Sequence, residues 1–184
     1  MSAEREPEAA APAPRRRIFF ALWPDAATRR AIVRAARAAV RHCGGKPTTH
    51  ANLHVTLAFL GPVGAETLAA VEALVLPPAS PFTLVLDRLG LWERAQILWL
   101  APSDPPPALV ALERGLWDRL VALGFTRDPR PYHPHVTLAR KAQTARGRVA
   151  RVVWPVESLA LVESKTGPRH SRYTVLKTWQ FRQP

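Results

Sequence analysis

The sequence predicts an α+β fold made of two related lobes that face each other across a cleft. The pentapeptide HVTLA occurs twice, at His54–Ala58 and at His135–Ala139. Each copy follows a run of β-favouring residues and then a helical pattern that ends at glycine, so one unit is repeated along the chain. Such a repeat favours two lobes related by a pseudo-twofold axis, with the two HVTLA strands opposite each other.

The first half begins with a buried strand at 17–24, where aromatic and aliphatic residues run together. Asp25 can cap the helix that follows, in which apolar residues recur at helical spacing until Gly44. The first HVTLA motif lies in a strand expected at 53–60. A short helix is expected from about 65 to 76, where prolines stop it.

In the second half, strand-like runs begin at Phe82 and Gln96 and are expected to form a hairpin. Leucines at helical spacing from Leu109 predict a helix that ends at Gly124. Further strands are expected at 135–140, which holds the second HVTLA motif, and from Ser158 and Arg172.

Composition restricts the class of protein and its partners. The chain has 26 Lys and Arg against 14 Asp and Glu, a formal charge of +12, which predicts attraction to polyanions such as RNA. Most of these cations are arginines, in a chain that is also rich in alanine and proline, so coding bias is an equally good explanation of the charge. Cys43 is the only cysteine, which excludes an intramolecular disulfide and fits a reducing cytoplasm.

The N-terminal residues 1–16 combine acids, prolines and alanines without a continuous apolar segment. We expect a disordered tail there, neither a secretory signal nor a membrane span, followed by a single bilobal domain at 17–184. Partners in a membrane are not expected, and we expect a monomer.

Side chains alternate across a strand, so His54 and Thr56 share one face of the first HVTLA strand, and His135 and Thr137 share one face of the second. A single such histidine is usually structural. Packing does not require histidine and threonine twice, however, so the repeated motif favours chemistry. Two opposed histidines suit a reaction in which one proton is removed while another is delivered.

Phosphoryl transfer is such a reaction, because the attacking and leaving oxygens lie on opposite sides of phosphorus. The hydroxyls of Thr56 and Thr137 can donate to the non-bridging oxygens, and Arg140 can supply a charged fork. A metal site at His133, His135 and His54 is the alternative. We disfavour it because no acidic or cysteine partner sits at ligand spacing.

The ordered pair of motifs resembles the 2H phosphoesterase superfamily, and within it the RNA 2',3'-cyclic phosphodiesterases, also called 2'-5' RNA ligases. FFALWP, LHVTLAFLG, PHVTLAR and the closing ESKTGPRHSRYTVLKTW follow in the order typical of that group. The resemblance implies two antiparallel sheets flanking a central cleft, with helices outside. It also implies catalysis without a metal or other cofactor.

The resemblance further implies an activity and residue roles. The expected reaction is hydrolysis of an RNA-terminal 2',3'-cyclic phosphate to a 2'-phosphate, with reversible 2'-5' ligation as an added activity. The implied roles are His54 as proton donor and His135 as proton acceptor, with Thr56, Thr137 and Arg140 holding the phosphate.

Three aromatic residues flank the motifs. Core packing is expected for Trp23 and Phe59, whereas Tyr132 is expected to line the cleft and stack on a terminal base. Two other functions stay open: a 2H enzyme acting on a small cyclic nucleotide or an ADP-ribose cyclic phosphate, and a noncatalytic clamp that binds RNA ends.

Overall fold

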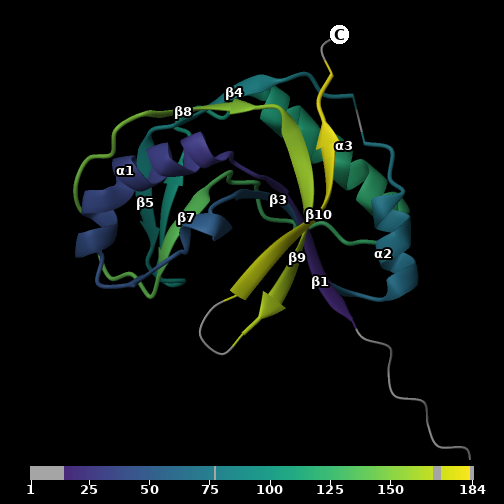
Figure 1. Cartoon of the computed structure of the whole chain (residues 1–184), viewed down its shortest axis with the longest axis horizontal. Helices are drawn as coiled ribbons and strands as arrows, with labels where there is room; N and C mark the ends of the chain where they lie inside the picture. The colour runs from purple at the N-terminus through teal and green to yellow at the C-terminus, as the bar shows by residue number, and fades with distance from the viewer. Residues whose placement is uncertain (1–14, 77, 168–170, 183–184) are drawn as a thin grey trace, which may run out of the picture.

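A computed structural model describes residues 15–76, 78–167 and 171–182. The predicted α+β class is confirmed: antiparallel strands form two sheets, and three α-helices pack outside them (Figure 1). Of the tail expected at 1–16, residues 1–14 lie outside the described part of the chain, and Arg16 already belongs to the first strand. No helix among the described residues is both long and apolar enough to cross a membrane.

The main sheet has eight strands in the order β10-β9-β1-β3-β7-β6-β5, with β2 paired to β7. Its strands are β1 (Arg16–Leu22), β2 (Lys46–Pro47), β3 (Val55–Val63), β5 (Arg88–Trp92), β6 (Ile97–Ala101), β7 (Val136–Arg140), β9 (Ser158–Thr166) and β10 (Ser171–Gln180). The second sheet pairs β4 (Phe82–Leu86) with β8 (Val152–Val156). The helices are α1 (Ala26–His42), α2 (Ala65–Glu72) and α3 (Pro107–Ala122), with a short 3-10 turn, η1 (His50–Asn52).

The two halves repeat one order of elements about the seam between β3 and β7. The first runs β1, α1, β3, β4, β5 and the second runs β6, α3, β7, β8, β9. The first half adds β2, η1 and α2 to this order, and the second adds β10. In each half a single residue, Asp87 or Glu157, separates the last two strands of the shared order. β3 meets β7 through one antiparallel pair, Val55 with Val136. The predicted pseudo-twofold relation is therefore confirmed.

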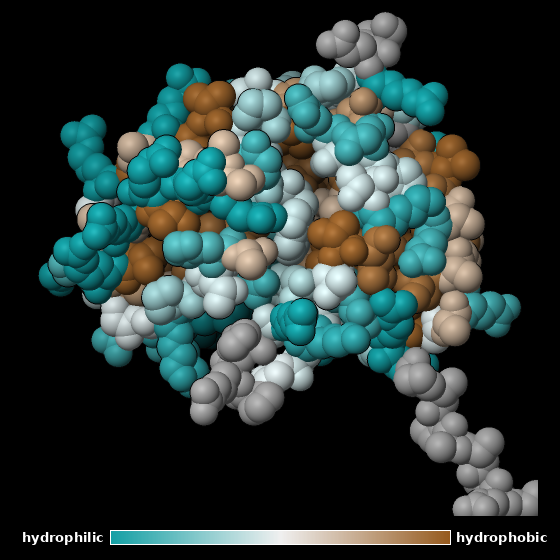
Figure 2. All heavy atoms as spheres, viewed as in Figure 1, coloured by the Kyte–Doolittle hydropathy of each residue, from teal (hydrophilic) through white to brown (hydrophobic). Residues whose placement is uncertain are grey.

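The helices cross between the halves. α1 belongs to the first half but packs on β7 and β8, whereas α3 belongs to the second half and packs on β3. Figure 1 shows α1 beside β7 at one side of the molecule and α3 with α2 at the other. Each lobe is therefore built from both halves of the sequence. In the same view, many hydrophilic side chains project from the surface on the side where α1 lies (Figure 2).

Local signals at α1 act as predicted. The Asp25 side chain accepts a hydrogen bond of 2.7 Å from the Thr28 backbone N–H, which caps the first turn. The helix ends at His42, and Gly44 has a φ of +69°, a conformation that favours glycine. By contrast, α2 ends at Glu72, earlier than the expected 76.

The run from Phe82 to Trp92 was expected to be one strand of a hairpin, and this is wrong in part. It forms two strands in different sheets, β4 and β5, of which only β5 pairs with β6. The chain changes sheet at Asp87, whose carboxylate accepts hydrogen bonds of 2.8 Å and 2.9 Å from the backbone N–H and hydroxyl of Ser103. β8, the partner of β4, was not predicted from the sequence.

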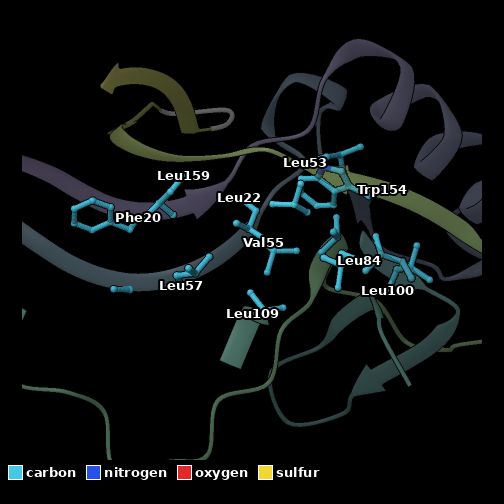
Figure 3. Packing of buried hydrophobic residues seen from close by; sticks show 14 of the residues in the cluster. Phe20, Leu22, Leu53, Val55, Leu57, Leu84, Leu100, Leu109, Trp154 and Leu159 are labelled. Carbon is cyan, nitrogen blue, oxygen red and sulfur yellow. The ribbon is translucent and has the colours of Figure 1, made fainter. Parts of the chain in front are cut away.

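The core lies between the main sheet, the β4–β8 pair and the helices. Phe20, Leu22, Val55 and Leu57 point into it from β1 and β3, towards Leu109 of α3 (Figure 3). The second sheet adds Leu84 and Trp154 to the core. Leu100 of β6, Leu159 of β9 and Leu53, which precedes β3, complete it. Because this face of β3 is apolar and buried, its other face is left for polar side chains.

Candidate active site

The two histidines stand immediately before β3 and β7, the strands that join the halves. Val55 and Val136 are paired and fully buried, so the side chains on either side of each valine point to the opposite face of the sheet. His54 and His135 are both partly buried there. The seam between the lobes thus carries one histidine from each motif on the same face.

A cavity of about 620 Å³ opens on this face. It is lined by the residues predicted for acid-base chemistry and phosphate binding, namely His54, Thr56, His135, Thr137 and Arg140. The structure therefore brings together five residues from two motifs that are far apart in the sequence. Their roles in catalysis stay a prediction.

A bulge in each motif decides which side chain comes next on the cavity face. On β3, Thr56 and Ala58 pair with consecutive residues of β1, which leaves Leu57 as the extra residue. Leu138 is the extra residue in the same place on β7. The bulges turn Phe59 and Arg140 towards the cavity, at corresponding positions of the two motifs.

Each imidazole is held by a backbone carbonyl two residues earlier. His54 Nδ1 lies 2.6 Å from the Asn52 carbonyl oxygen, and His135 Nδ1 lies 2.8 Å from the His133 carbonyl oxygen. A carbonyl can only accept a hydrogen bond, so both Nδ1 atoms carry hydrogen and both Nε2 atoms are left for chemistry. His54 Nε2 lies 3.0 Å from Thr56 Oγ1, which donates to it when the ring is neutral.

Aromatic rings surround His54. Its ring centroid lies 5.0 Å from that of Phe19, 5.4 Å from that of Tyr173 and 5.5 Å from that of Trp23, which stacks on it. Burial among these rings lowers the pKa of His54 to about 4, and the nearby charges of His135 and Arg140 act in the same direction. The Asn52 carbonyl opposes this by stabilising the charged ring.

His135 has a more open environment. Its aromatic contact is Trp92, whose ring lies edge-on at 4.5 Å between centroids. Burial also lowers the pKa of His135, and the charges of Arg140 and His133 add to this effect. Both imidazoles therefore favour the neutral form at neutral pH.

The cavity carries a strong positive charge. Four cationic side chains line it, from β1, from β2 and from the end of β7: Arg17, Lys46, Arg140 and Lys141. None of the described residues that line it is acidic. A cavity of this kind attracts phosphate groups and stabilises negative charge that develops on them.

The aromatic residues differ from expectation. Phe59 was expected in the core, and this is wrong: 51% of it is exposed. Trp23 packs against the small buried cluster that includes Phe19 and Ala21. Tyr132 lines a neighbouring cavity of about 880 Å³ with Thr56, and its hydroxyl donates to the Thr56 carbonyl at 3.2 Å. Base stacking by Tyr132 stays a prediction.

The alternative metal site gains no support from the geometry. His133 is exposed, and its carbonyl holds His135. Across the described ranges, no three His, Cys, Asp or Glu side chains are close enough together to hold a metal ion.

Several residues of the site were missed from the sequence. The backbone carbonyl of Asn52 accepts a hydrogen bond from His54. Its side-chain amide donates a hydrogen bond of 2.7 Å to the Ser171 carbonyl of β10. Arg17 and Lys46 enter the cavity from strands that precede the motif. Asn52 and His133 stand at the same position, two residues before each motif histidine, and this shared position could have indicated their matching roles. The sequence around Arg17 and Lys46 contains no such signal.

Comparison with known proteins agrees with this geometry. A family model described as the 2'-5' RNA ligase superfamily matches residues 23–168. This chain belongs to that superfamily. A protein of Escherichia coli named RNA 2',3'-cyclic phosphodiesterase is 35% identical over 177 residues, covering 91% of this chain and 97% of the relative. One of Thermus thermophilus with the same name is 33% identical over 180 residues, with 90% of each chain covered.

Solved structures of related proteins have a fold similar to that of this superfamily member. The crystal structure of E. coli LigT complexed with 3'-AMP superposes with a TM-score of 0.81 at 33% identity, covering 92% of this chain and 99% of that chain. TT0787 of Thermus thermophilus superposes with a TM-score of 0.69 at 28% identity, covering 90% of this chain and 98% of that one. The resemblance inferred from the two HVTLA motifs is therefore confirmed at the level of family and fold.

Proposed function

We propose that this protein is an RNA 2',3'-cyclic phosphodiesterase that opens the cyclic phosphate by acid-base catalysis with two histidines and without a metal. One observation carries the proposal: His54 and His135, each with Nδ1–H bound to a carbonyl and Nε2 left for chemistry, line the same cationic cavity. The names of the relatives from E. coli and T. thermophilus support the substrate class.

In the proposed reaction, water attacks phosphorus and the bond from phosphorus to the ribose 3'-oxygen breaks, which leaves a 2'-phosphate. His135 Nε2 takes a proton from the attacking water. His54 Nε2 gives its proton to the departing 3'-oxygen. Each histidine directly precedes one member of the antiparallel pair Val55–Val136, so the two rings approach the cavity from opposite ends of that pair. This suits an in-line displacement, because the base and the acid must act from opposite sides of phosphorus.

His54 must be protonated to act as the acid, although burial lowers its pKa to about 4. A bound phosphodiester is anionic, and an anion next to an imidazole favours the charged ring. Substrate binding thus raises the pKa of His54 and prepares it as an acid. After the ring is protonated, its Nε2–H donates to the substrate in place of Thr56 Oγ1.

Thr56, Thr137 and Arg140 hold the phosphate in this scheme. The two hydroxyls donate to the non-bridging oxygens, where charge builds up in the transition state. The guanidinium of Arg140 adds a planar fork with a fixed charge. The site binds RNA ends with a 2',3'-cyclic phosphate. With an RNA 5'-hydroxyl in place of water, the same displacement joins that RNA through a 2'-5' linkage, and the reverse of this step breaks the linkage and re-forms the cyclic phosphate.

The test uses the full chain, a cyclic-phosphate-ended oligoribonucleotide and a chelator. Turnover to a 2'-phosphate product is expected to persist in chelator. His54→Ala and His135→Ala are each expected to lower kcat by about 10²–10⁴-fold while much of the RNA affinity is kept. Activity lost in chelator contradicts the metal-free reaction, and wild-type protein that binds RNA without turnover supports a clamp instead.

A second substrate separates the roles of the histidines. Bis(4-nitrophenyl) phosphate has a leaving group that departs without a proton, so the acid is not needed. His54→Ala is expected to keep most of the activity on this ester, whereas His135→Ala loses activity on both substrates. The reverse pattern exchanges the two roles. A 2',3'-cyclic mononucleotide, assayed in parallel, tests the alternative that the substrate is a small cyclic nucleotide.

A further inference from the structure

The neighbouring cavity of about 880 Å³ adjoins the reaction site beside His135. It shares Thr56, Phe59 and His135 with the cavity of about 620 Å³ that holds both histidines. His54, by contrast, is not among the described residues that line it. Its volume lies in the range of about 300–1,000 Å³ that is typical of ligand sites. The neighbouring cavity therefore opens next to one of the two histidines only, the one proposed as the base.

Three segments form the walls of the neighbouring cavity: α3, the turn between β5 and β6, and the loop before the second motif. Two contacts fix that loop. The Arg127 guanidinium donates hydrogen bonds of 2.7 Å and 2.9 Å to the carboxylate of Glu113 on α3, which is only 3% exposed. The Tyr132 hydroxyl donates to the Thr56 carbonyl at 3.2 Å. The cavity is thus shaped by specific contacts on both sides of the loop.

Cationic and aromatic side chains line this cavity. Arg94 of the β5–β6 turn and Arg130 of the loop are both exposed. Arg130 is ion-paired with Asp128, whereas no acidic side chain of the described residues pairs with Arg94. Trp92 also lines the cavity, and its ring lies edge-on to that of His135. Exposed guanidinium groups next to an aromatic ring suit the phosphates and bases of single-stranded RNA.

Hydrolysis does not account for this space, because its nucleophile is a water molecule. In ligation the nucleophile is the 5'-hydroxyl of a second RNA strand. An in-line displacement places that hydroxyl opposite the departing 3'-oxygen, next to His135, so the strand behind it extends away on the same side. A smaller cavity of about 310 Å³ also borders His135, but it shares no other residue with the cavity of about 620 Å³. The neighbouring cavity is therefore the better placed of the two.

We propose that the neighbouring cavity binds the RNA strand with the 5'-hydroxyl, which attacks in 2'-5' ligation and departs when the linkage is broken. In ligation the 5'-oxygen bonds to phosphorus and passes its proton to His135 Nε2. The bond from phosphorus to the 3'-oxygen breaks, and that oxygen takes the proton of His54 Nε2. The reverse step returns both protons. The inference rests on the proposed function and deepens it, because it adds a site for a second RNA strand.

The test compares one substrate that has this strand with two that lack it. The first is an RNA with a single internal 2'-5' linkage. The others are the same RNA ending in a 2',3'-cyclic phosphate, and the same RNA with a methyl ester on its 2'-phosphate, which keeps the reacting bond but has no strand beyond it. Ala95→Trp introduces a large ring into the cavity from the β5–β6 turn, and Ala95→Ser keeps the cavity open.

Ala95→Trp is expected to lower kcat/KM for the 2'-5'-linked RNA by about tenfold or more, because the ring and the strand compete for one space. It is expected to leave hydrolysis of the cyclic phosphate and cleavage of the methyl ester close to wild type, which also shows that the variant folds. Arg94→Gln is expected to raise KM for the linked RNA about two- to fivefold, the range for one exposed ion pair. Ala95→Ser is expected to match wild type on all three substrates.

Three outcomes overturn the inference and leave the hydrolytic function intact. In one, Ala95→Trp loses as much activity on the cyclic-phosphate RNA as on the linked RNA, which places the strand with the cyclic phosphate in the neighbouring cavity. In another, Ala95→Trp loses activity on no substrate. In the third, wild type hydrolyses the cyclic phosphate but does not cleave the 2'-5' linkage.

A binding measurement keeps this test separate from that of the reaction. Fluorescence anisotropy follows a labelled 5'-hydroxyl RNA as it binds to protein saturated with RNA that ends in a 2'-phosphate. Binding that is lost in Ala95→Trp but kept in Ala95→Ser supports the second-strand site even if wild type turns over no substrate and the proposed function fails. Equal binding by wild type and Ala95→Trp overturns the site.

Discussion

His54 and His135 come from identical pentapeptides but have different surroundings. His54 has three aromatic neighbours, Phe19, Trp23 and Tyr173, whereas His135 has Trp92. Burial is the main cause of the lowered pKa in both. The flanking rings, which come from other strands and from a loop, bury the two histidines to different extents and so contribute to the lowered pKa of each.

This difference predicts how kcat/KM depends on pH. Trp23→Leu removes the ring that stacks on His54, so it is expected to raise the pKa of His54 towards 6.5 and move one limb of the bell to higher pH. Trp92→Leu is the matched control and is expected to move the other limb. Profiles measured on a cyclic-phosphate substrate check this, and unshifted limbs in both variants contradict it.

The same buried imidazole predicts how stability depends on pH. The unfolded state takes up a proton on His54 near pH 6.5, whereas the folded state does so only near pH 4. The contribution of His54 to the free energy of unfolding is therefore fully present above about pH 6.5. It is lost as the pH falls towards 4, and the loss from this one residue is roughly 3 kcal/mol.

Urea unfolding measured between pH 8 and pH 4 tests this prediction. In His54→Leu the fall in unfolding free energy is expected to be smaller by roughly that amount. Parallel curves for wild type and variant would mean that another group dominates the pH dependence.

At this scale strand alternation predicted four of the polar residues that line the cavity, His54, Thr56, His135 and Thr137. Arg140 was predicted from its place at the end of the second motif, and it reaches the cavity because Leu138 is an extra residue in β7. The sequence did not predict that Phe59 is exposed. A bulge depends on how β1 pairs with β3, and HVTLAF alone gives no sign that Leu57 is the extra residue. Asn52 was missed because it acts through its backbone carbonyl, which any residue type can supply.

At the scale of single elements, local hydrogen bonds help to fix where a helix begins, as the cap of α1 at Asp25 shows. The Asp25 carboxylate satisfies the Thr28 N–H, and this hydrogen bond is the main reason that the pKa of Asp25 is lowered. Asp25→Ala is expected to lower the free energy of unfolding by about 1 kcal/mol, whereas Asp25→Ser keeps a capping oxygen and loses little. Chemical denaturation of both variants checks this; equal losses would mean that the cap does not contribute.

Strands that change sheet were harder to predict than helices. β4 and β5 read as one apolar run because Asp87 is the only break between them, and a strand that switches sheets has no distinct composition. β8 contains Pro155, which discourages a strand, yet it pairs with β4 at the edge of a two-stranded sheet where a missing N–H is tolerated. Since β8 corresponds to β4 in the repeat, a closer comparison of the halves would have revealed it.

Over the whole molecule, the charge of +12 has two explanations, RNA binding and coding bias, and the salt dependence of KM distinguishes them. The four cavity cations predict that log KM for an oligonucleotide rises with log salt concentration with a slope of roughly 3, at ~0.7 per phosphate contact. Lys46→Gln is expected to reduce this slope by about 0.7.

Substitutions on α1 provide the control. Arg34→Gln and Arg37→Gln lie on α1, which contributes no residue to the cavity lining, and are expected to leave the slope unchanged. A fall in slope for the α1 variants equal to that for Lys46→Gln would place RNA on the helix as well, and would argue against coding bias as the origin of those arginines.

The crossing of α1 and α3 has a consequence for how such a chain could arise and fold. Either half, taken alone, would leave its own HVTLA strand without the helix that covers it, and would carry a helix whose apolar side has no sheet to meet. Two copies of a half could satisfy each other by exchanging helices, which would also bring two histidines to one seam. A single repeat would thus be expected to exist as an interlocked dimer, and in the present chain neither half can reach its final packing before the other has been made.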